Sequence, residues 1–173
     1  MVIINVTLNL PFGCHNFSLS LFFFIKRPSF SSKTEFRHAN RAFFYISYME
    51  NFVIEATKHT PLVSGNCGTG EILISGRSIP ENATNFYRPF LVWIDEYKRN
   101  PHPKTHLTFY LDYLNSISQK VVYDILESLN DISNNNELIV FWKYDEDDEE
   151  ILDEGKVFQS RFELDFRLIP VTA

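Results

Sequence analysis

The chain has 173 residues, a formal net charge of −6 and only two cysteines. Two distant cysteines, Cys14 and Cys67, exclude a disulfide-stapled scaffold and a zinc knuckle, so we expect a reducing, cytoplasmic location. The acidic balance argues against a nucleic acid partner, because its phosphates would be repelled.

The first 48 residues differ from the rest. They carry a net charge of +4 and nine of the seventeen phenylalanines, so residues 49–173 carry −10. The apolar run 21–25 precedes Lys26 and Arg27, whereas a secretory signal places its positive charges first. The run is also far shorter than the ~20 residues that cross a bilayer. We therefore expect residues 1–48 to be a leader outside the domain, with Met49 as the initiator. A tail that lies on a membrane surface is the alternative.

Residues 49–173 have the length of one domain. Residues 52–57 predict a strand, and the glycine-rich stretch 64–70 predicts a turn, after which 71–75 return as the second arm of a hairpin. A phosphate-binding loop is not supported, because no lysine–serine pair follows the glycines. A helix is expected from Ser78 to about Arg99, with a kink or a late start at Pro89. Its apolar face is expected to consist of Phe86, Phe90, Trp93, Ile94 and Tyr97.

The second half alternates strands with helices. Residues 105–114 predict a strand, the segment after it predicts a second helix that ends at 134–136, and residues 150–159 predict a third. The unbroken apolar run 138–142 is typical of a strand covered on both faces. Expected inward residues are Leu107, Phe109, Leu111 and Tyr113 in the first of these strands, Val121, Val122, Ile125, Leu126, Leu129 and Ile132 in the second helix, and Phe162, Leu164, Phe166 and Leu168 in the last strand.

The order is strand, strand, helix, strand, helix, strand, helix, strand. It predicts an α/β (α+β) fold in which one mixed sheet of about five strands packs against three helices.

Ser116 lies where the strand ending at Leu114 passes through Asn115 into the second helix. A helix start leaves backbone N–H groups unpaired and carries the positive end of the helix dipole. Ser116 can be a plain helix cap, which contributes about 1 kcal/mol in any protein. A phosphate on its hydroxyl would be stabilised by the same groups and would change the surface that a partner meets. The residues alone leave both interpretations open.

Catalysis at Ser116 is not supported, because no nucleophile-elbow spacing surrounds it and His59, His102 and His106 are not placed as its base. The acidic stretch 145–150 lacks the ligand pattern and central glycine of a calcium loop, so we expect a solvated loop before a helix. We expect no metal, no cofactor and no enzyme activity.

Three motifs carry a family resemblance: Thr57-Lys58-His59-Thr60-Pro61, Pro80-Glu81-Asn82, and Tyr113-Leu114-Asn115-Ser116 running into Ser118 and Lys120. With them, residues 52–169 resemble the SiaC family of bacterial regulatory phosphoproteins, whose fold is similar to STAS domains such as anti-anti-sigma factors. In that family the residue after the asparagine accepts the phosphate, which implies Ser116 here. Ile117 replaces a further small hydroxyl residue, and Ser118 is a weaker candidate.

The resemblance implies a partner-switching circuit and a STAS-like sheet. By this resemblance, a SiaB-type kinase is expected to phosphorylate the protein and a PP2C-like phosphatase to reverse this, while the unmodified form binds a target such as a diguanylate cyclase. Asn115 is expected to position the junction, while Tyr113, Lys120, Glu81 and Asn82 shape the site or contact the partner. The alternatives are an anti-anti-sigma factor that binds an anti-sigma factor, and a small-molecule-binding or hydrolytic domain. No nucleic acid or membrane partner is expected.

Overall fold

The computed structural model describes residues 2–9, 16–23, 44–47, 49–134 and 136–172. The chain divides into two compact units, residues 1–48 and residues 49–173. In the described part of the first unit, β1 (Val2–Asn9), β2 (Asn16–Phe23) and β3 (Phe44–Ser47) pair in that order as an antiparallel sheet. That residues 1–48 are a leader stays a prediction.

The described part of the second unit contains one six-stranded mixed sheet. Its strands lie in chain order, and the first three pair antiparallel while the last four pair parallel. They are β4 (Phe52–Ile54), β5 (Leu62–Asn66), β6 (Glu71–Ser78), β7 (Lys104–Leu114), β8 (Glu137–Asp145) and β9 (Asp165–Val171).

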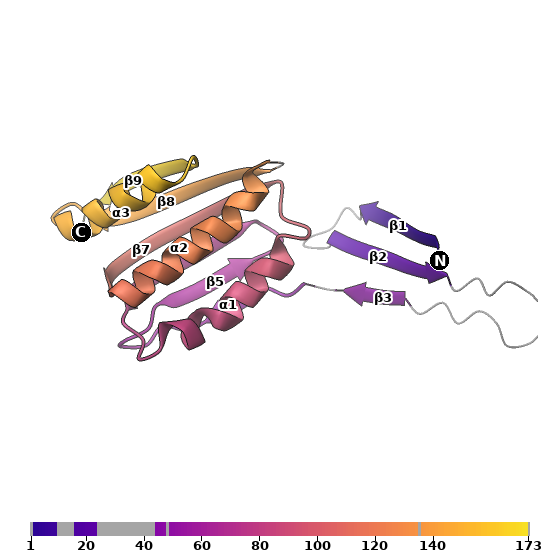
Figure 1. Cartoon of the computed structure of the whole chain (residues 1–173), viewed down its shortest axis with the longest axis horizontal. Coiled ribbons are helices and arrows are strands. Elements are labelled where there is room, and N and C mark those ends of the chain that lie inside the picture. The colour runs from indigo at the N-terminus through magenta and orange to yellow at the C-terminus, as the bar shows by residue number, and fades with distance from the viewer. Residues whose placement is uncertain (1, 10–15, 24–43, 48, 135, 173) are drawn as a thin grey trace, which may run out of the picture. The chain divides into compact units, whose positions relative to one another are not determined.

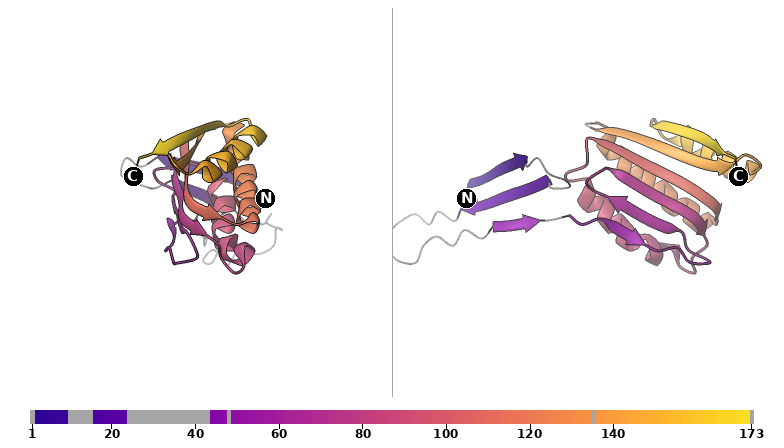
Figure 2. Two further views of the ribbon diagram at one scale, coloured as in Figure 1. Left: turned by 90° about the vertical axis from the view of Figure 1, so that its left-hand side faces the viewer. Right: turned by 180° about the vertical axis from the view of Figure 1, so that it is seen from behind.

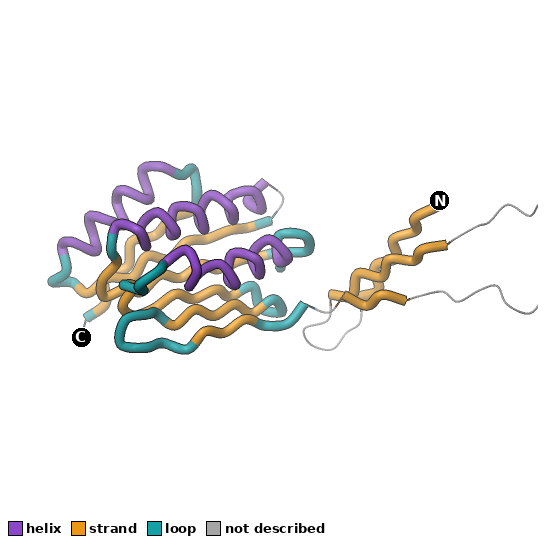
Figure 3. Tube along the Cα trace, turned by 60° about the horizontal axis from the view of Figure 1, so that its bottom comes forward, coloured by secondary structure: helices purple, strands orange, loops and turns teal. Residues whose placement is uncertain are grey.

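Each parallel connection passes through a helix, as parallel strands require. The helices are α1 (Ala83–Tyr97), α2 (Ser116–Asn130), which continues into the 3₁₀ turn η1 (Asp131–Asn134), and α3 (Glu149–Arg161). These helices lie side by side on one face of the sheet (Figures 1 and 2), which gives the unit two layers (Figure 3). Their N-termini therefore all follow the carboxyl ends of the parallel strands.

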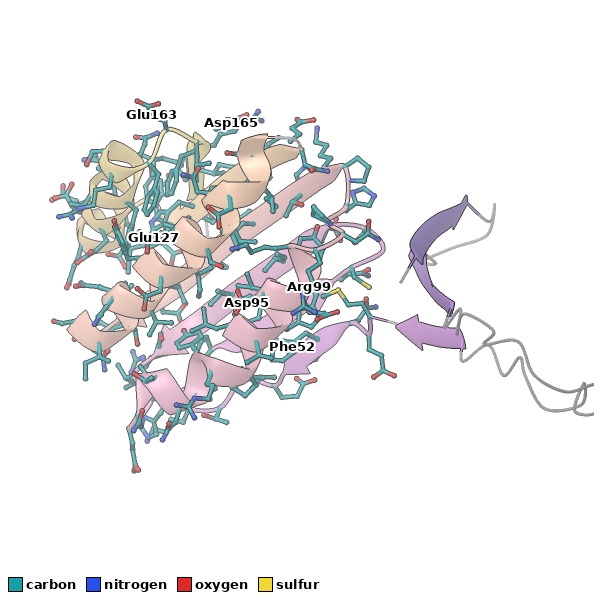
Figure 4. The ribbon with its side chains drawn as sticks, turned by 45° about the vertical axis from the view of Figure 1, so that its right-hand side comes forward. Phe52, Asp95, Arg99, Glu127, Glu163 and Asp165 are labelled. Carbon is teal, nitrogen blue, oxygen red and sulfur yellow. The ribbon has the colours of Figure 1, made fainter. Side chains whose placement is uncertain are left out.

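The core between the two layers is built around two tryptophans that pack against glycines. Trp93 of α1 lies over Gly65 of β5, and Trp142 of β8 lies against Gly155 of α3. Phe52 of β4 lies beside α1 (Figure 4), with its ring centroid 5.4 Å from that of Phe90. All six residues predicted to form the apolar face of the second helix are buried.

The structure corrects the predicted hairpin. Residues 62–66, part of which was predicted as a turn, form β5 and pair with β4 on one side and β6 on the other. Only residues 67–70 form the turn, which ends at Gly70 with a positive φ of 73°. The strand was missed because Ser64 and Gly65 have turn character in isolation, whereas the glycine is needed here to accommodate Trp93.

Three further boundaries differ from the predictions. The first strand ends at Ile54 instead of residue 57, and the last begins at Asp165, so Phe162 and Leu164 pack on the core from the preceding loop. Helix α1 starts at Ala83, where the side chain of Asn82 caps its first turn, and it continues through Pro89.

The strand at 138–142 was predicted to be covered on both faces, but the described helices cover only one (Figure 2). On the uncovered face Phe141 is half-buried, with His106 at its ring edge and the Arg167 guanidinium above it. The unbroken apolar run thus correctly indicated a strand inside the sheet. It did not indicate helices on both faces of that sheet.

Candidate functional site

The three motifs of the resemblance meet at one edge of the sheet. Residues 79–82 follow β6 and residues 115–118 follow β7, and these parallel strands end side by side because Ser78 pairs with Leu114. The loop 55–61 reaches the same edge because it leads into β5, whose first residue pairs with Ser75 of β6. Two backbone hydrogen bonds connect these loops, from Ile79 N to His59 O at 2.9 Å and from Asn115 N to Ser78 O at 3.2 Å.

A β-bulge shapes the end of β7. Gly76 of β6 pairs with Leu111, but the next residue, Arg77, pairs with Tyr113, so Asp112 is an extra residue in β7. Gly76 has a positive φ of 97°, a conformation that glycine adopts without strain. The extra residue reverses which side chains face inward. Tyr113, predicted to be an inward residue, is consequently 43% exposed.

Ser116 is the first residue of α2 and is exposed. Asn115 is the N-cap: its side-chain Oδ1 accepts a hydrogen bond from Ser118 N at 2.8 Å, and its carbonyl accepts one from Gln119 N at 2.9 Å. The backbone N–H groups of Ser116 and Ile117 therefore have no partner within the helix. The first turn also contains no acidic residue. The hydroxyl of Ser116 lies at the positive end of an uncompensated helix dipole.

Ser118 has a different environment and is fully buried. Its Oγ donates to the Ser78 carbonyl at 3.0 Å and accepts from Ser78 Oγ at 2.9 Å. Ser78 Oγ also shares a hydrogen bond of 2.8 Å with the hydroxyl of Tyr87. Burial raises the pKa of Tyr87 to about 12, so this hydroxyl keeps its proton at neutral pH.

Ser78 and Tyr87 were not predicted as part of the site. Tyr87 was detectable, because it lies four residues after Ala83 and three before Phe90 on the buried face of α1. The predicted face instead included Phe86, which is only half-buried. No local pattern distinguishes Ser78 from a serine at any strand end.

The remaining predicted residues are exposed on α2 and in the loop before α1. Lys120 is exposed on α2, four residues after Ser116 and so on the same side of the helix. Glu81 and Asn82 are exposed in the loop before α1, and Asn82 Oδ1 accepts from Asn85 N at 2.9 Å. Asn82 therefore caps α1 as Asn115 caps α2.

The acidic stretch 145–150 forms the end of β8, a turn and the start of α3. Asp148 is the N-cap of α3, and its Oδ1 accepts from Ile151 N at 3.0 Å. In the part of the chain that the structure describes, no group of three or more His, Cys, Asp or Glu residues is placed to hold a metal ion. None of the described helices has the length and apolar character needed to cross a membrane.

A sequence model of the SiaC family of regulatory phosphoproteins matches residues 54–171. The chain belongs to the SiaC family. This SiaC family protein is similar to an uncharacterised protein of Pseudomonas aeruginosa, with 26% identity over 112 residues that cover 64% of the chain and 89% of that protein.

Solved structures of SiaC from Pseudomonas aeruginosa have the same fold. Apo-SiaC aligns with a TM-score of 0.64 and 24% identity, covering 70% of this chain and 99% of that one. A structure of the diguanylate cyclase SiaD in complex with its activator SiaC gives a TM-score of 0.65 and 24% identity, covering 69% and 99%.

These findings confirm the predicted family and the α/β architecture, with six strands in the described sheet in place of about five. Membership of a family of regulatory phosphoproteins also confirms that this SiaC family protein is a regulator and not an enzyme.

Proposed function

We propose that this protein is a cytoplasmic switch that is reversibly phosphorylated at Ser116 and binds its target protein in the unmodified form. The observation that carries the proposal is the contrast between the two hydroxyls of the junction. Ser116 is exposed at the first position of α2, whereas Ser118 is fully buried and hydrogen-bonded to Ser78. The Ser116 hydroxyl is therefore accessible to a kinase, whereas the Ser118 hydroxyl is not.

The surroundings of Ser116 support binding by the unmodified form. Tyr113 and Ile117, which flank it, are 43% and 57% exposed, although large apolar side chains are usually buried. A partner that covers these side chains would also cover the Ser116 hydroxyl. A phosphate there would add close to two negative charges, and burying them in an apolar contact is costly. Phosphorylation would therefore release the partner.

Lys120 and the helix dipole are both placed to stabilise a phosphate on Ser116. A negative group four residues before a lysine on a helix is favourably placed, and so is an anion at the helix start. Phosphorylation would consequently preserve the fold while it changes the surface. Glu81 and Asn82, in the neighbouring loop, are proposed to border the surface that the partner contacts.

For the partners we propose a SiaB-type kinase, a PP2C-like phosphatase and a target such as a diguanylate cyclase. The last is supported by the solved complex in which SiaC of Pseudomonas aeruginosa is the activator of the cyclase SiaD.

The test compares three variants as bait in pull-downs from the native cell lysate, with peptide mapping of the native protein. Ser116→Ala is expected to capture the same target as the unmodified parent, and Ser116→Asp to lose at least ten-fold of it. Ser160→Asp places the same charge at an exposed serine of α3 and is expected to bind like the parent. All three should melt close to the parent temperature.

Two results would contradict the proposal. One is equal capture of the target by Ser116→Asp and Ser116→Ala. The other is a peptide map of protein from cells with an active circuit that shows the phosphoryl group on a residue other than Ser116.

A further inference from the structure

Buried hydroxyl groups gather behind the first turn of α2. The described residues include three buried polar ones, Ser78, Thr105 and Ser118, each with no exposed surface. Two of the three belong to one group with the buried hydroxyl of Tyr87, which we call the hydroxyl cluster. The third, Thr105, is not bonded to this cluster and shares a hydrogen bond with the Tyr97 hydroxyl.

The hydroxyl cluster joins three elements of the fold. Ser78 is the last residue of β6, Tyr87 lies in α1, and Ser118 lies in the first turn of α2. The carbonyl of Ser78 accepts from both Asn115 N, at 3.2 Å, and Ser118 Oγ, at 3.0 Å. Ser78 Oγ also donates to Ser118 Oγ at 2.9 Å, so three hydrogen bonds attach the start of α2 to the end of β6. Tyr87 of α1 bonds Ser78 Oγ from the other side.

Stability alone does not account for this arrangement. A buried hydrogen bond contributes about 1 kcal/mol net, and replacing a complete set of partners by apolar groups of the same shape is nearly neutral. Hydrogen bonds differ from apolar contacts in that they fix distance and direction. The cluster therefore determines where the first turn of α2 lies more than how strongly it is held.

We propose that Ser78, Ser118 and Tyr87 are positioning residues for the switch, which fix the first turn of α2 so that a phosphoryl group on Ser116 meets aligned backbone N–H groups. The inference rests on the proposed function, because it concerns the phosphorylated form of Ser116. It assigns Ser118 a role that phosphorylation of Ser118 itself would destroy.

The test uses the full chain with phosphoserine genetically encoded at position 116 and follows the second ionisation of the phosphate by phosphorus NMR. Aligned N–H groups favour the dianion, so its pKa in the folded parent is expected below the value in the urea-unfolded chain. Ser118→Ala is expected to return the pKa at least halfway to the unfolded value, and Tyr87→Phe to shift it in the same direction. Each substitution leaves Ser78 Oγ with its other partner.

Thr105→Val is the matched control. It removes another fully buried hydroxyl, which bonds Tyr97 at 2.7 Å near the start of β7, at the other end of the strand from Ser116. It is expected to leave the phosphate pKa at the parent value. If Thr105→Val shifts the pKa as far as Ser118→Ala, general loosening explains the effect and the proposal is wrong.

The proposal is also overturned if folded Ser118→Ala keeps the parent pKa, or if the folded parent does not differ from the unfolded chain. Should Ser118→Ala fail to fold, Tyr87→Phe replaces it in the test, and a folded Tyr87→Phe that keeps the parent phosphate pKa overturns the proposal. Because the phosphoserine is encoded, the outcome does not depend on a kinase. Absence of phosphate on Ser116 in native protein would overturn the proposed function. It would not change the phosphate pKa values measured for the parent and its variants.

Discussion

At the scale of single residues, neighbouring polar side chains at the α2 junction have different environments. Asn115 is half-buried and caps the helix, Ser116 is exposed, and Ser118 is buried against Ser78. The helical rotation between positions 116 and 118 separates the last two, because residues two apart do not face the same side. Two similar serines therefore differ completely in their access to another protein.

Asn115→Ala is expected to lower the free energy of unfolding by about 1 kcal/mol, since it removes the side-chain acceptor of the Ser118 N–H. Urea unfolding measures this change. Asn115→Asp, which keeps an acceptor oxygen, is the control and should remain close to the parent. An alanine variant as stable as the parent would show that the cap does not stabilise the junction.

At the scale of secondary-structure elements, packing overrides local preference in α3. Gly155 is buried in the middle of this helix, although glycine is a poor helix former. A Cβ at this position would lie 2.6 Å from Trp142 Nε1, which donates to the Ile151 carbonyl of the same helix at 2.9 Å. The glycine allows the indole ring to approach the helix closely.

Gly155→Ala is expected to destabilise the protein by about 1–3 kcal/mol, because the overpacking against Trp142 outweighs the gain in helix propensity. Thermal unfolding followed by tryptophan fluorescence measures it. Ser160→Ala, at an exposed position of the same helix, is expected to stay within about 0.5 kcal/mol of the parent. A stabilised Gly155→Ala variant would contradict the packing argument.

Strand β7 shows how one inserted residue changes a surface. Strict alternation predicts Tyr113 on the inner face, but the bulge at Asp112 turns it outward and brings Leu114 inward, where it is 6% exposed. The bulge thus places the apolar side chain of Tyr113 on the surface near Ser116 and buries Leu114 in the core.

At the scale of the whole molecule, the second unit includes the residues from Met49 onward. Trp93 Nε1 donates to the Glu50 carbonyl at 2.9 Å, and the Phe52 ring lies 6.1 Å from that of Trp93. Asn51 Oδ1 accepts from Cys67 N at 3.2 Å. The segment 49–52 is therefore part of the packed fold.

A chain that starts at Met49 is expected to melt within ~2 °C of the 173-residue chain, because residues 1–48 form a separate unit. A chain that starts at Glu55 lacks β4 and the contacts that Trp93 makes with Glu50 and Phe52, and it is expected to melt clearly lower. Calorimetry of the three chains checks both statements. Equal melting of the two shortened chains would show that the segment 49–54 does not contribute to stability.

The sequence by itself determined the parts of this protein that depend on local periodicity and local chemistry. The apolar face of α2, the alternation of helices with parallel strands, and the polar residues at the start of α2 all repeat or occur within a few neighbouring positions. These features were sufficient to predict the fold class and to place Ser116 at the start of a helix. Its role as a phosphorylation site stays a prediction.

Only the tertiary structure decided the features that depend on contacts between distant positions. Ser78 and Ser118 are forty residues apart and meet because β6 and β7 end side by side. Strand β5 pairs with β4 and β6 although it contains Gly65, where a side chain would collide with the ring of Trp93. Tyr113 is exposed because a bulge changes the register of a strand pair. Long-range packing and strand register produce no periodic pattern in the sequence. The roles of these residues therefore follow only from the contacts that the folded chain makes.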